Sequence, residues 1–208
     1  GSFNAPIPGM SPGIITSDGK EVEVNQMGEL IMRKSSIGLT KSLWGDDDRY
    51  INNYWTVIKN FWVHGDLASR DKDGHWYLHG RSDDTIKVSG KRIGPSELES
   101  VVVKSGKVKE VAAVGITDEN KGSKIILSIV PLDKKDELKT DFFADLIIKD
   151  LGKSFKPDKI IFVKDLPKTR NMKIMRRVIK SCLTNEDPGD VSTLLNPESI
   201  EEIKQNAI

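Results

Sequence analysis

The chain before Arg81 alternates hydrophobic and polar residues in short runs, a pattern typical of half-buried strands. Residues 13–33 alternate in this way around Asp18-Gly19, a pair that favours a tight hairpin turn. Phe61–Val63 and His75–Leu78 predict further strands joined at Asp73-Gly74, and Asp46–Ile58 has helical spacing with acidic residues at its start. We therefore predict a small antiparallel β subdomain with one helix.

Beyond Arg81 the pattern changes to strands that alternate with amphipathic helices. We expect a capping box in which Ser96 caps the first helix and Glu99 reaches back. Gly152 is expected to end a helix and Pro197 to open one. The predicted strands are Val108–Ile116, Lys124–Val130 and Lys159–Val163, and the predicted helices run to about Lys104, over Thr140–Leu151 and Ile174–Leu183, and from Pro197 onward.

These patterns predict an α+β protein of two parts. The first, residues 1–82, is the small antiparallel β subdomain. The second, residues 83–208, is a compact α+β domain with helices flanking a sheet. The boundary falls in the charged stretch Arg81–Asp84.

Composition narrows the class of protein. Hydrophobic residues make up 37% and charged residues 30%, which suits a globular protein with a highly charged surface and argues against disorder. A net charge of +1 provides no overall attraction for nucleic acid or acidic membranes. The single cysteine, Cys182, excludes an internal disulfide and is expected in the core. No apolar run approaches the ~20 residues of a membrane span, so we expect a cytoplasmic protein. The chain begins without methionine, and we interpret it as a fragment of a longer protein.

Four acidic or basic positions around the boundary could bind a ligand or serve the fold. Asp66, predicted at a strand end after a glycine, could accept hydrogen bonds from a diol or cap its own turn. Arg81 could hold phosphate or hydroxyl groups with its planar fork or be an ordinary surface residue. Asp83 and Asp84 are adjacent, so in an extended chain they point apart, which favours a joint between domains over a metal pair.

Two basic segments follow. Ser89–Pro95 is a glycine-bracketed turn that could hold a phosphate or be an ordinary β-turn, and it lacks the pattern of a P-loop. Lys164–Lys180 holds seven basic residues, which suits a solvated face or an anion-binding patch. Aromatic residues do not interleave there, so base stacking on a nucleic acid is not supported, and salt-dependent oligonucleotide binding would test that alternative. The triple aspartate at Asp46–Asp48 is interpreted as a helix cap rather than a calcium loop. A metal site at His64, His75 and His79 is disfavoured, because His75 and His79 lack a third ligand nearby.

The order of these motifs is more specific than any one of them. WVHGD, GRSDDTIKVSGKRIGPSELES and PKTRNMKIMRR follow one another with a spacing that resembles the AMP-forming acyl-CoA synthetases. FWVHGDLASRDKDGHWYLHGR and the tail GDVSTLLNPESIEEI are similar to the acetyl-/propionyl-CoA synthetase branch. The resemblance covers most of the chain and identifies it as a C-terminal fragment, with residues 83–208 as the mobile lid domain.

The resemblance implies a two-step reaction in which a small carboxylic acid and ATP, with Mg²⁺, form an acyl-adenylate that CoA then attacks. The acyl pocket and phosphate loop would lie in a missing N-terminal domain, so the fragment alone should be inactive. The implied roles are ribose or nucleotide binding by Asp66 and Arg81, the hinge at Asp83, adenylation by Lys173, and nucleotide or CoA binding by Ser89, Gly90 and Arg92.

One departure and two alternatives accompany this interpretation. Asn171-Met172 replace the Ser-Gly usual in the family, and since methionine lacks the freedom of glycine at positive φ, the loop before Lys173 is expected to differ. The alternatives are a free-standing module that binds nucleotide, CoA or a protein without catalysis, and an adenylation domain that loads a carrier protein. The acyl chain and the oligomeric state are not encoded in these residues.

Overall fold

The computed structural model describes residues 1–132 and 138–207. The chain divides into two compact units, Gly1–Asp83 and Asp84–Ile208. Both contain helices and antiparallel strand pairs, and the second also has a parallel pair, which confirms the α+β class.

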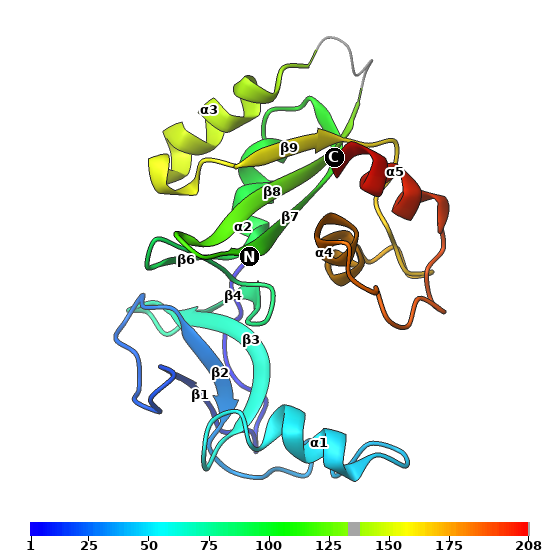
Figure 1. Ribbon diagram of the computed structural model, residues 1–208. Coiled ribbons are helices and arrows are strands. Elements are labelled where there is room, and N and C mark those ends of the chain that lie inside the picture. Colours follow the sequence, from blue (N-terminus) through cyan, green and yellow to red (C-terminus); the bar gives the residue numbers. More distant parts are fainter. Residues whose placement is uncertain (133–137, 208) are drawn as a thin grey trace. The chain divides into compact units, whose positions relative to one another are not determined.

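The first unit is a four-stranded antiparallel sheet in the order β1-β2-β3-β4, accompanied by one helix (Figure 1). Alternation places Ile14 and Leu30 in one apolar cluster and Ile15 and Ile31 in another, so both faces of the sheet bury side chains. The elements are β1 Pro12–Ile15, β2 Gly28–Met32, α1 Asp47–Tyr54, β3 Trp62–Arg70 and β4 Trp76–Arg81.

Three predictions for this unit need correction. Asp18-Gly19 does form a tight turn, with the Gly19 amide donating to the Thr16 carbonyl at 3.0 Å, but the next strand begins only at Gly28. Asp46 caps α1 as predicted, accepting from the Arg49 amide at 3.1 Å, yet the helix ends at Tyr54 rather than Ile58. β3 and β4 both extend well beyond the predicted ranges.

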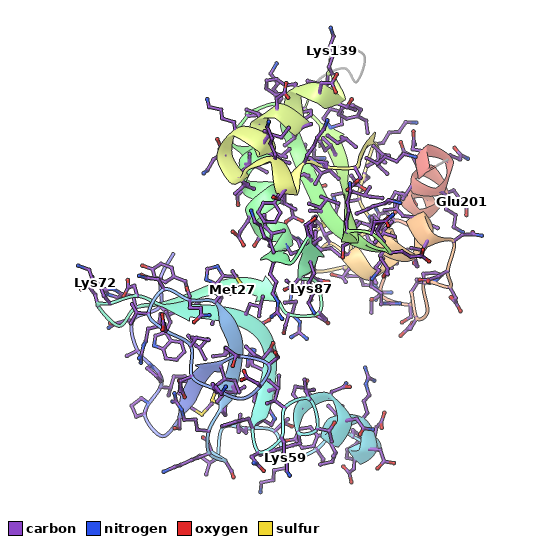
Figure 2. The ribbon with its side chains drawn as sticks, turned by 60° about the vertical axis from the view of Figure 1, so that its left-hand side comes forward. Met27, Lys59, Lys72, Lys87, Lys139 and Glu201 are labelled. Atoms are coloured by element: carbon purple, nitrogen blue, oxygen red, sulfur yellow. The ribbon has the colours of Figure 1, made fainter. Side chains whose placement is uncertain are left out.

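The second unit packs helices on both faces of a three-stranded sheet in the order β7-β8-β9 (Figures 1 and 2). β7 and β8 are antiparallel, and β9 runs parallel to β8 after the crossover through α3. The elements are β5 Ile86–Val88, β6 Lys91–Ile93, α2 Pro95–Val103, β7 Val108–Asp118, β8 Gly122–Pro131, α3 Thr140–Leu151, the 3₁₀ helix η2 Lys153–Phe155, β9 Lys159–Phe162, α4 Arg176–Thr184 and α5 Glu198–Ala207.

The alternation of β7 and β8 assigns each helix to a face. Val111 and Leu127 point to the side covered by α2 and α3, where Phe143 is fully buried. Ala112 and Ile126 point to the side covered by α4 and α5, and Cys182 is buried there, which confirms its predicted core position. On α5, Glu201 is exposed (Figure 2).

The start of α2 differs from the predicted capping box. The helix begins at Pro95, whose fixed φ suits the first helical position, so Gly94 is the N-cap. Glu97 accepts the Gly94 amide at 3.1 Å, which is the back-bond that we assigned to Glu99. Ser96 therefore lies inside the first turn, and Glu99 is available for contacts elsewhere in the unit.

Candidate functional site

A bulge in β3 carries the first group of predicted site residues. Between the pairs Ile31–Val63 and Glu29–Leu67, β3 has three residues, His64 to Asp66, opposite one residue of β2. Gly65 adopts φ 84°, a conformation open to glycine, and this lets the strand bend and continue. Asp66 therefore lies inside β3, whereas the sequence predicted a strand end.

The bulge brings Asp66 beside Arg81, its register partner on β4. Arg81 Nη1 lies 3.6 Å from Asp66 Oδ1, and Arg81 Nε lies 3.2 Å from Asp83 Oδ1. The other oxygen of Asp66 lies 2.8 Å from His64 Nδ1. Asp66, Arg81 and Asp83 thus form one charged cluster, in which a guanidinium fork is held between two carboxylates.

An open pocket of about 470 Å³ lies against this cluster. Gly65, Arg81 and Asp83 line it together with residues of α1 and with Glu29, whereas Asp66 does not line it. Ser82 Oγ donates to Glu29 Oε1 at 2.7 Å, and burial raises the pKa of Glu29. A concave site with a cation and several hydrogen-bonding groups suits a polar ligand that carries hydroxyl or phosphate groups.

The Ser89-Gly90 turn joins β5 to β6. Ser89 and Gly90 have φ of 50° and 79°, and they connect the paired residues Val88 and Lys91, as in a two-residue type I′ hairpin turn. The Ser89 amide donates to the Lys121 carbonyl at 2.8 Å, so this turn packs against the β7–β8 turn. Arg92 lies opposite Lys87 on the hairpin and is exposed.

A second open pocket, of about 450 Å³, includes Ser89 in its lining. Lys121, Lys153 and Lys156 line it as well, and Lys121 Nζ is paired with Asp158 Oδ1 at 2.6 Å. The hairpin is thus an ordinary β-turn in form that also borders a lysine-rich pocket.

Lys173 lies on a tight exposed turn. The Thr169 amide donates to the Lys173 carbonyl at 2.9 Å, and the Met172 amide donates to the Thr169 carbonyl at 2.8 Å. Met172 takes φ 60°, the left-handed conformation that glycine adopts without strain. Met172 therefore strains the backbone of this turn. Its side chain is 60% exposed.

The Ser89 and Lys173 turns are attached to β7 at different places. The Lys173 turn follows Lys168, which pairs with Glu110, whereas the Ser89 turn contacts Lys121, just beyond Asp118 at the end of the strand. At 3.3 Å per residue, the strand from Glu110 to Asp118 is about 26 Å long. The two turns thus do not form one site within this unit.

The basic segment Lys164–Lys180 is not a uniform solvated face. Lys168 is buried in ion pairs, and Arg176 pairs with Glu99. Arg177 Nη2 donates to the Asp190 carbonyl at 2.6 Å. These inward contacts divide the run, and Lys173 belongs to the part that remains exposed.

The histidines have separate partners. His75 Nδ1 lies 3.4 Å from Asp71 Oδ2, and His79 Nε2 lies 2.8 Å from Ser69 Oγ. Across residues 1–132 and 138–207 we find no group of three His, Cys, Asp or Glu residues arranged to hold a metal ion. Within the same ranges, no helix has the length and apolar character needed to cross a membrane.

The sequence did not predict that Glu99, Lys168, Arg176 and Asn196 hold the segment around Lys173 through ion pairs and hydrogen bonds. Asp165 stands three residues before Lys168 and could have indicated a local partner. The pairing of Arg176 with Glu99 joins residues 77 positions apart, so no local pattern could have revealed it.

Comparison with known proteins agrees with this arrangement. Residues 97–173 match the family described as AMP-binding enzyme C-terminal domain. The acetyl-coenzyme A synthetase of Methanothrix soehngenii is 38% identical over 98% of this chain, which covers 31% of that relative. Acetoacetyl-CoA synthetase from Streptomyces lividans shares the fold with a TM-score of 0.86 at 22% identity, over 100% of this chain and 32% of the other. The amide bond synthetase McbA from Marinactinospora thermotolerans does so with a TM-score of 0.73 at 23% identity, over 86% and 36%.

Residues 97–173 therefore belong to the C-terminal domains of AMP-binding enzymes. The chain as a whole is a relative of the acetyl-coenzyme A synthetases, and it spans about a third of the length of the curated relatives that it matches. These similarities agree with the family indicated by the sequence motifs.

Proposed function

We propose that this chain is the C-terminal portion of an AMP-forming short-chain acyl-CoA synthetase. The observation that carries the proposal is the similarity to acetyl-coenzyme A synthetases over 98% of the chain. The exposed Lys173 turn and the polar pocket beside Arg81 support it, since both offer groups suited to a nucleotide. A cytoplasmic location is part of the same proposal and agrees with the single cysteine, Cys182, which is free and buried.

In the first step, a carboxylate oxygen attacks the α-phosphorus of ATP, which enters as its magnesium complex, and pyrophosphate leaves. Asp66 and Arg81 hold the ribose region, with Arg81 facing the pocket and Asp66 supporting it from behind. Lys173 offsets the negative charge that builds on the α-phosphate oxygens. Because the Lys173 ammonium is at the tip of a turn, it can reach a ligand bound by another part of the protein.

In the second step, the CoA thiol attacks the acyl carbon, the carbon–oxygen bond breaks and AMP leaves. Ser89, Gly90 and Arg92 contact the nucleotide or CoA phosphates in this step. Asp83 is the hinge about which residues 84–208 rotate, so that the Lys173 turn serves the first step and the Ser89-Gly90 turn serves the second at the same site. Two features support this role: the compact units divide directly after Asp83, and the turns are attached to β7 about 26 Å apart.

The test uses the full-length gene product and measures the two steps separately. Lys173→Ala should lower acid-dependent ATP–pyrophosphate exchange by about 100- to 1,000-fold, to a rate that can still be measured, while acyl transfer from supplied acyl-adenylate to CoA persists. Exchange within a few-fold of the wild type would exclude the adenylation role. Asp83→Pro should freeze the joint, sparing one half-reaction and damaging the other, and equal loss of both would argue against a hinge.

The acyl acceptor is the part of the proposal that the fold does not define, because an amide bond synthetase shares it. The similarity of the whole chain to acetyl-coenzyme A synthetases favours free CoA over a carrier protein. Assay of the gene product with CoA and with a pantetheinylated carrier protein distinguishes the two. Residues 1–208 alone should be inactive with either acceptor.

A further inference from the structure

Two ion-paired cations, the buried Lys168 and the half-buried Arg176, bracket the turn that carries Lys173. Lys168 precedes it and Arg176 follows it, as the first residue of α4. Lys168 and Ile174 form an isolated antiparallel bridge, which closes the base of the turn. The Lys173 ammonium has no partner among the residues that the structure describes.

Lys168 ties the first leg of the turn to β7. Only 5% of its side chain is exposed, and Nζ lies 2.7 Å from both Glu110 Oε2 on β7 and Asp165 Oδ1. Burial disfavours the charged form, but the two carboxylates outweigh it and raise the pKa of Lys168. The backbone is held as well, since the Lys168 amide donates to Asn196 Oδ1 at 3.0 Å.

Arg176 ties the second leg to the same strand through Glu99. Arg176 Nη2 lies 2.8 and 2.7 Å from the two oxygens of Glu99, and Nε lies 3.1 Å from Oε1. Oε1 also accepts the Ala113 amide of β7 at 2.9 Å. The remaining nitrogen of Arg176 lies 4.0 Å from Asp84 Oδ2, the residue after the proposed hinge.

The turn therefore has fixed ends and an exposed tip. Its legs are attached to β7 at Glu110 and, through Glu99, at Ala113, which are three residues apart on one strand. A planar guanidinium that makes two parallel bonds to a carboxylate fixes direction as well as distance, which a single ammonium contact does not. Such a frame restricts where the Lys173 Cα can lie.

We propose that Lys168 and Arg176, with their partners Glu110 and Glu99, are positioning residues that hold the Lys173 turn in place for the adenylation step. This inference rests on the proposed function. None of the four touches the reacting atoms; they act through the position of Lys173. The frame should matter to adenylation and not to acyl transfer, because only the first step uses this turn.

The test compares Arg176→Lys and Glu99→Gln with Arg177→Met in the full-length gene product. Arg176→Lys keeps the charge but loses the fork, and Glu99→Gln keeps an acceptor for the Ala113 amide. Since a displacement of about 1 Å can cost ~100-fold, we expect acid-dependent pyrophosphate exchange to fall by about 10- to 100-fold in both. Acyl transfer from supplied acyl-adenylate should stay within about two-fold, and Arg177→Met should match the wild type in both assays.

A double variant separates positioning from a general loss of folding. With Lys173→Ala present, adding Arg176→Lys should lower pyrophosphate exchange no further, because a frame without its lysine has nothing to position. A further loss equal to that of Arg176→Lys alone would overturn the proposal. So would an equal loss of both half-reactions in the single variants.

Hydrogen exchange tests the frame without any assay of function. In the chain of residues 1–208, Arg176→Lys and Lys168→Met should speed amide exchange in Thr169–Lys173 while β8 keeps its protection. Unchanged exchange in the turn would refute the frame. If Lys173→Ala left adenylation intact, the proposed function of Lys173 would be wrong. The positioning role of Lys168 and Arg176 would then be wrong as well, even if hydrogen exchange showed that they hold the turn in place.

Discussion

Replacement of Gly65 by alanine is expected to weaken nucleotide binding by displacing Arg81. A Cβ atom on Gly65 would lie 2.7 Å from Arg81 Nη2 and 3.1 Å from its Cζ and Nη1, so the guanidinium must move. The φ of 84° adds about 1–2 kcal/mol of backbone strain, offset by ~0.4–1 kcal/mol from the less flexible unfolded chain. We expect a net loss of roughly 1 kcal/mol in stability.

Displacement of Arg81 has a separate effect on binding. Its side chain is 52% exposed, so the contacts with Asp66 and Asp83 belong to the weak, screened class. We therefore expect a loss of up to about 1 kcal/mol in binding, which is a roughly five-fold rise in KM for ATP. ATP–pyrophosphate exchange by the full-length gene product measures this rise, and thermal unfolding measures stability.

Gly74 provides a matched control for Gly65. It has φ 87° in the β3–β4 turn, but a Cβ there would meet nothing within 4 Å. Gly74→Ala should therefore lower stability to a similar degree and leave KM for ATP unchanged. An equal rise of the KM for ATP in Gly65→Ala and Gly74→Ala would refute the displacement of Arg81. The displacement would also be refuted if Gly65→Ala still raised this KM in a protein that already carries Arg81→Ala.

Three further outcomes follow from single positions. Met172→Gly removes strain of about 1–2 kcal/mol at φ 60° but adds ~0.5–1 kcal/mol of unfolded-chain entropy from glycine. Denaturant unfolding should therefore show a stability gain of up to about 1.5 kcal/mol, and a loss would contradict the strained turn. Phe143→Ala should cost about 3–5 kcal/mol in urea unfolding because the ring is fully buried, and a cost under about 1 kcal/mol would mean that the core is assigned wrongly. The hydrogen bond from Lys124, 2.7 Å away, together with those from the Lys121 and Asn120 amides, lowers the pKa of Asp118 from 3.8 to about 2. Because the pKa of Asp118 is lower in the folded than in the unfolded chain, its ionised form stabilises the folded state above pH 3.8, and this contribution is lost as the pH falls toward about 2. Asp118→Asn should therefore reduce the dependence of unfolding on pH in the acid range. An NMR titration midpoint for Asp118 near 3.8 would disprove the shift.

Periodic segments were predicted well because their own side chains determine them. Thr140–Leu151 is a helix with the predicted bounds, since its apolar residues recur on one face and Gly152 follows. The start of α2 was predicted wrongly because two capping patterns overlap there, and Pro95 favours the earlier one. Asp66 was placed at a strand end because a bulge depends on the partner strand, which the local sequence does not contain.

The candidate site shows the same division between local and distant information. The Ser89-Gly90 turn was predicted from its own residues, since turn chemistry can be recognised locally, whereas Lys173 was singled out only by the resemblance of its segment to the family. It treated Lys168 as part of an exposed basic run, because burial of a lysine depends on carboxylates such as Glu110 that come from another strand. The roles of the site residues in catalysis stay predictions.

The hydrogen bonds of Asn196 give the second unit an order of assembly during synthesis. Asn196 accepts the Lys168 amide and donates through Nδ2 to the Leu166 carbonyl at 2.8 Å, across 28 and 30 residues of sequence. At ~5–20 residues per second, a ribosome adds Asn196 about 1–6 s after Lys168. During that interval the first leg of the Lys173 turn depends on water for bonds that the folded protein buries. The nascent turn is therefore completed by residues made well after it, and a pause in translation between Lys168 and Asn196 would prolong its unfinished state.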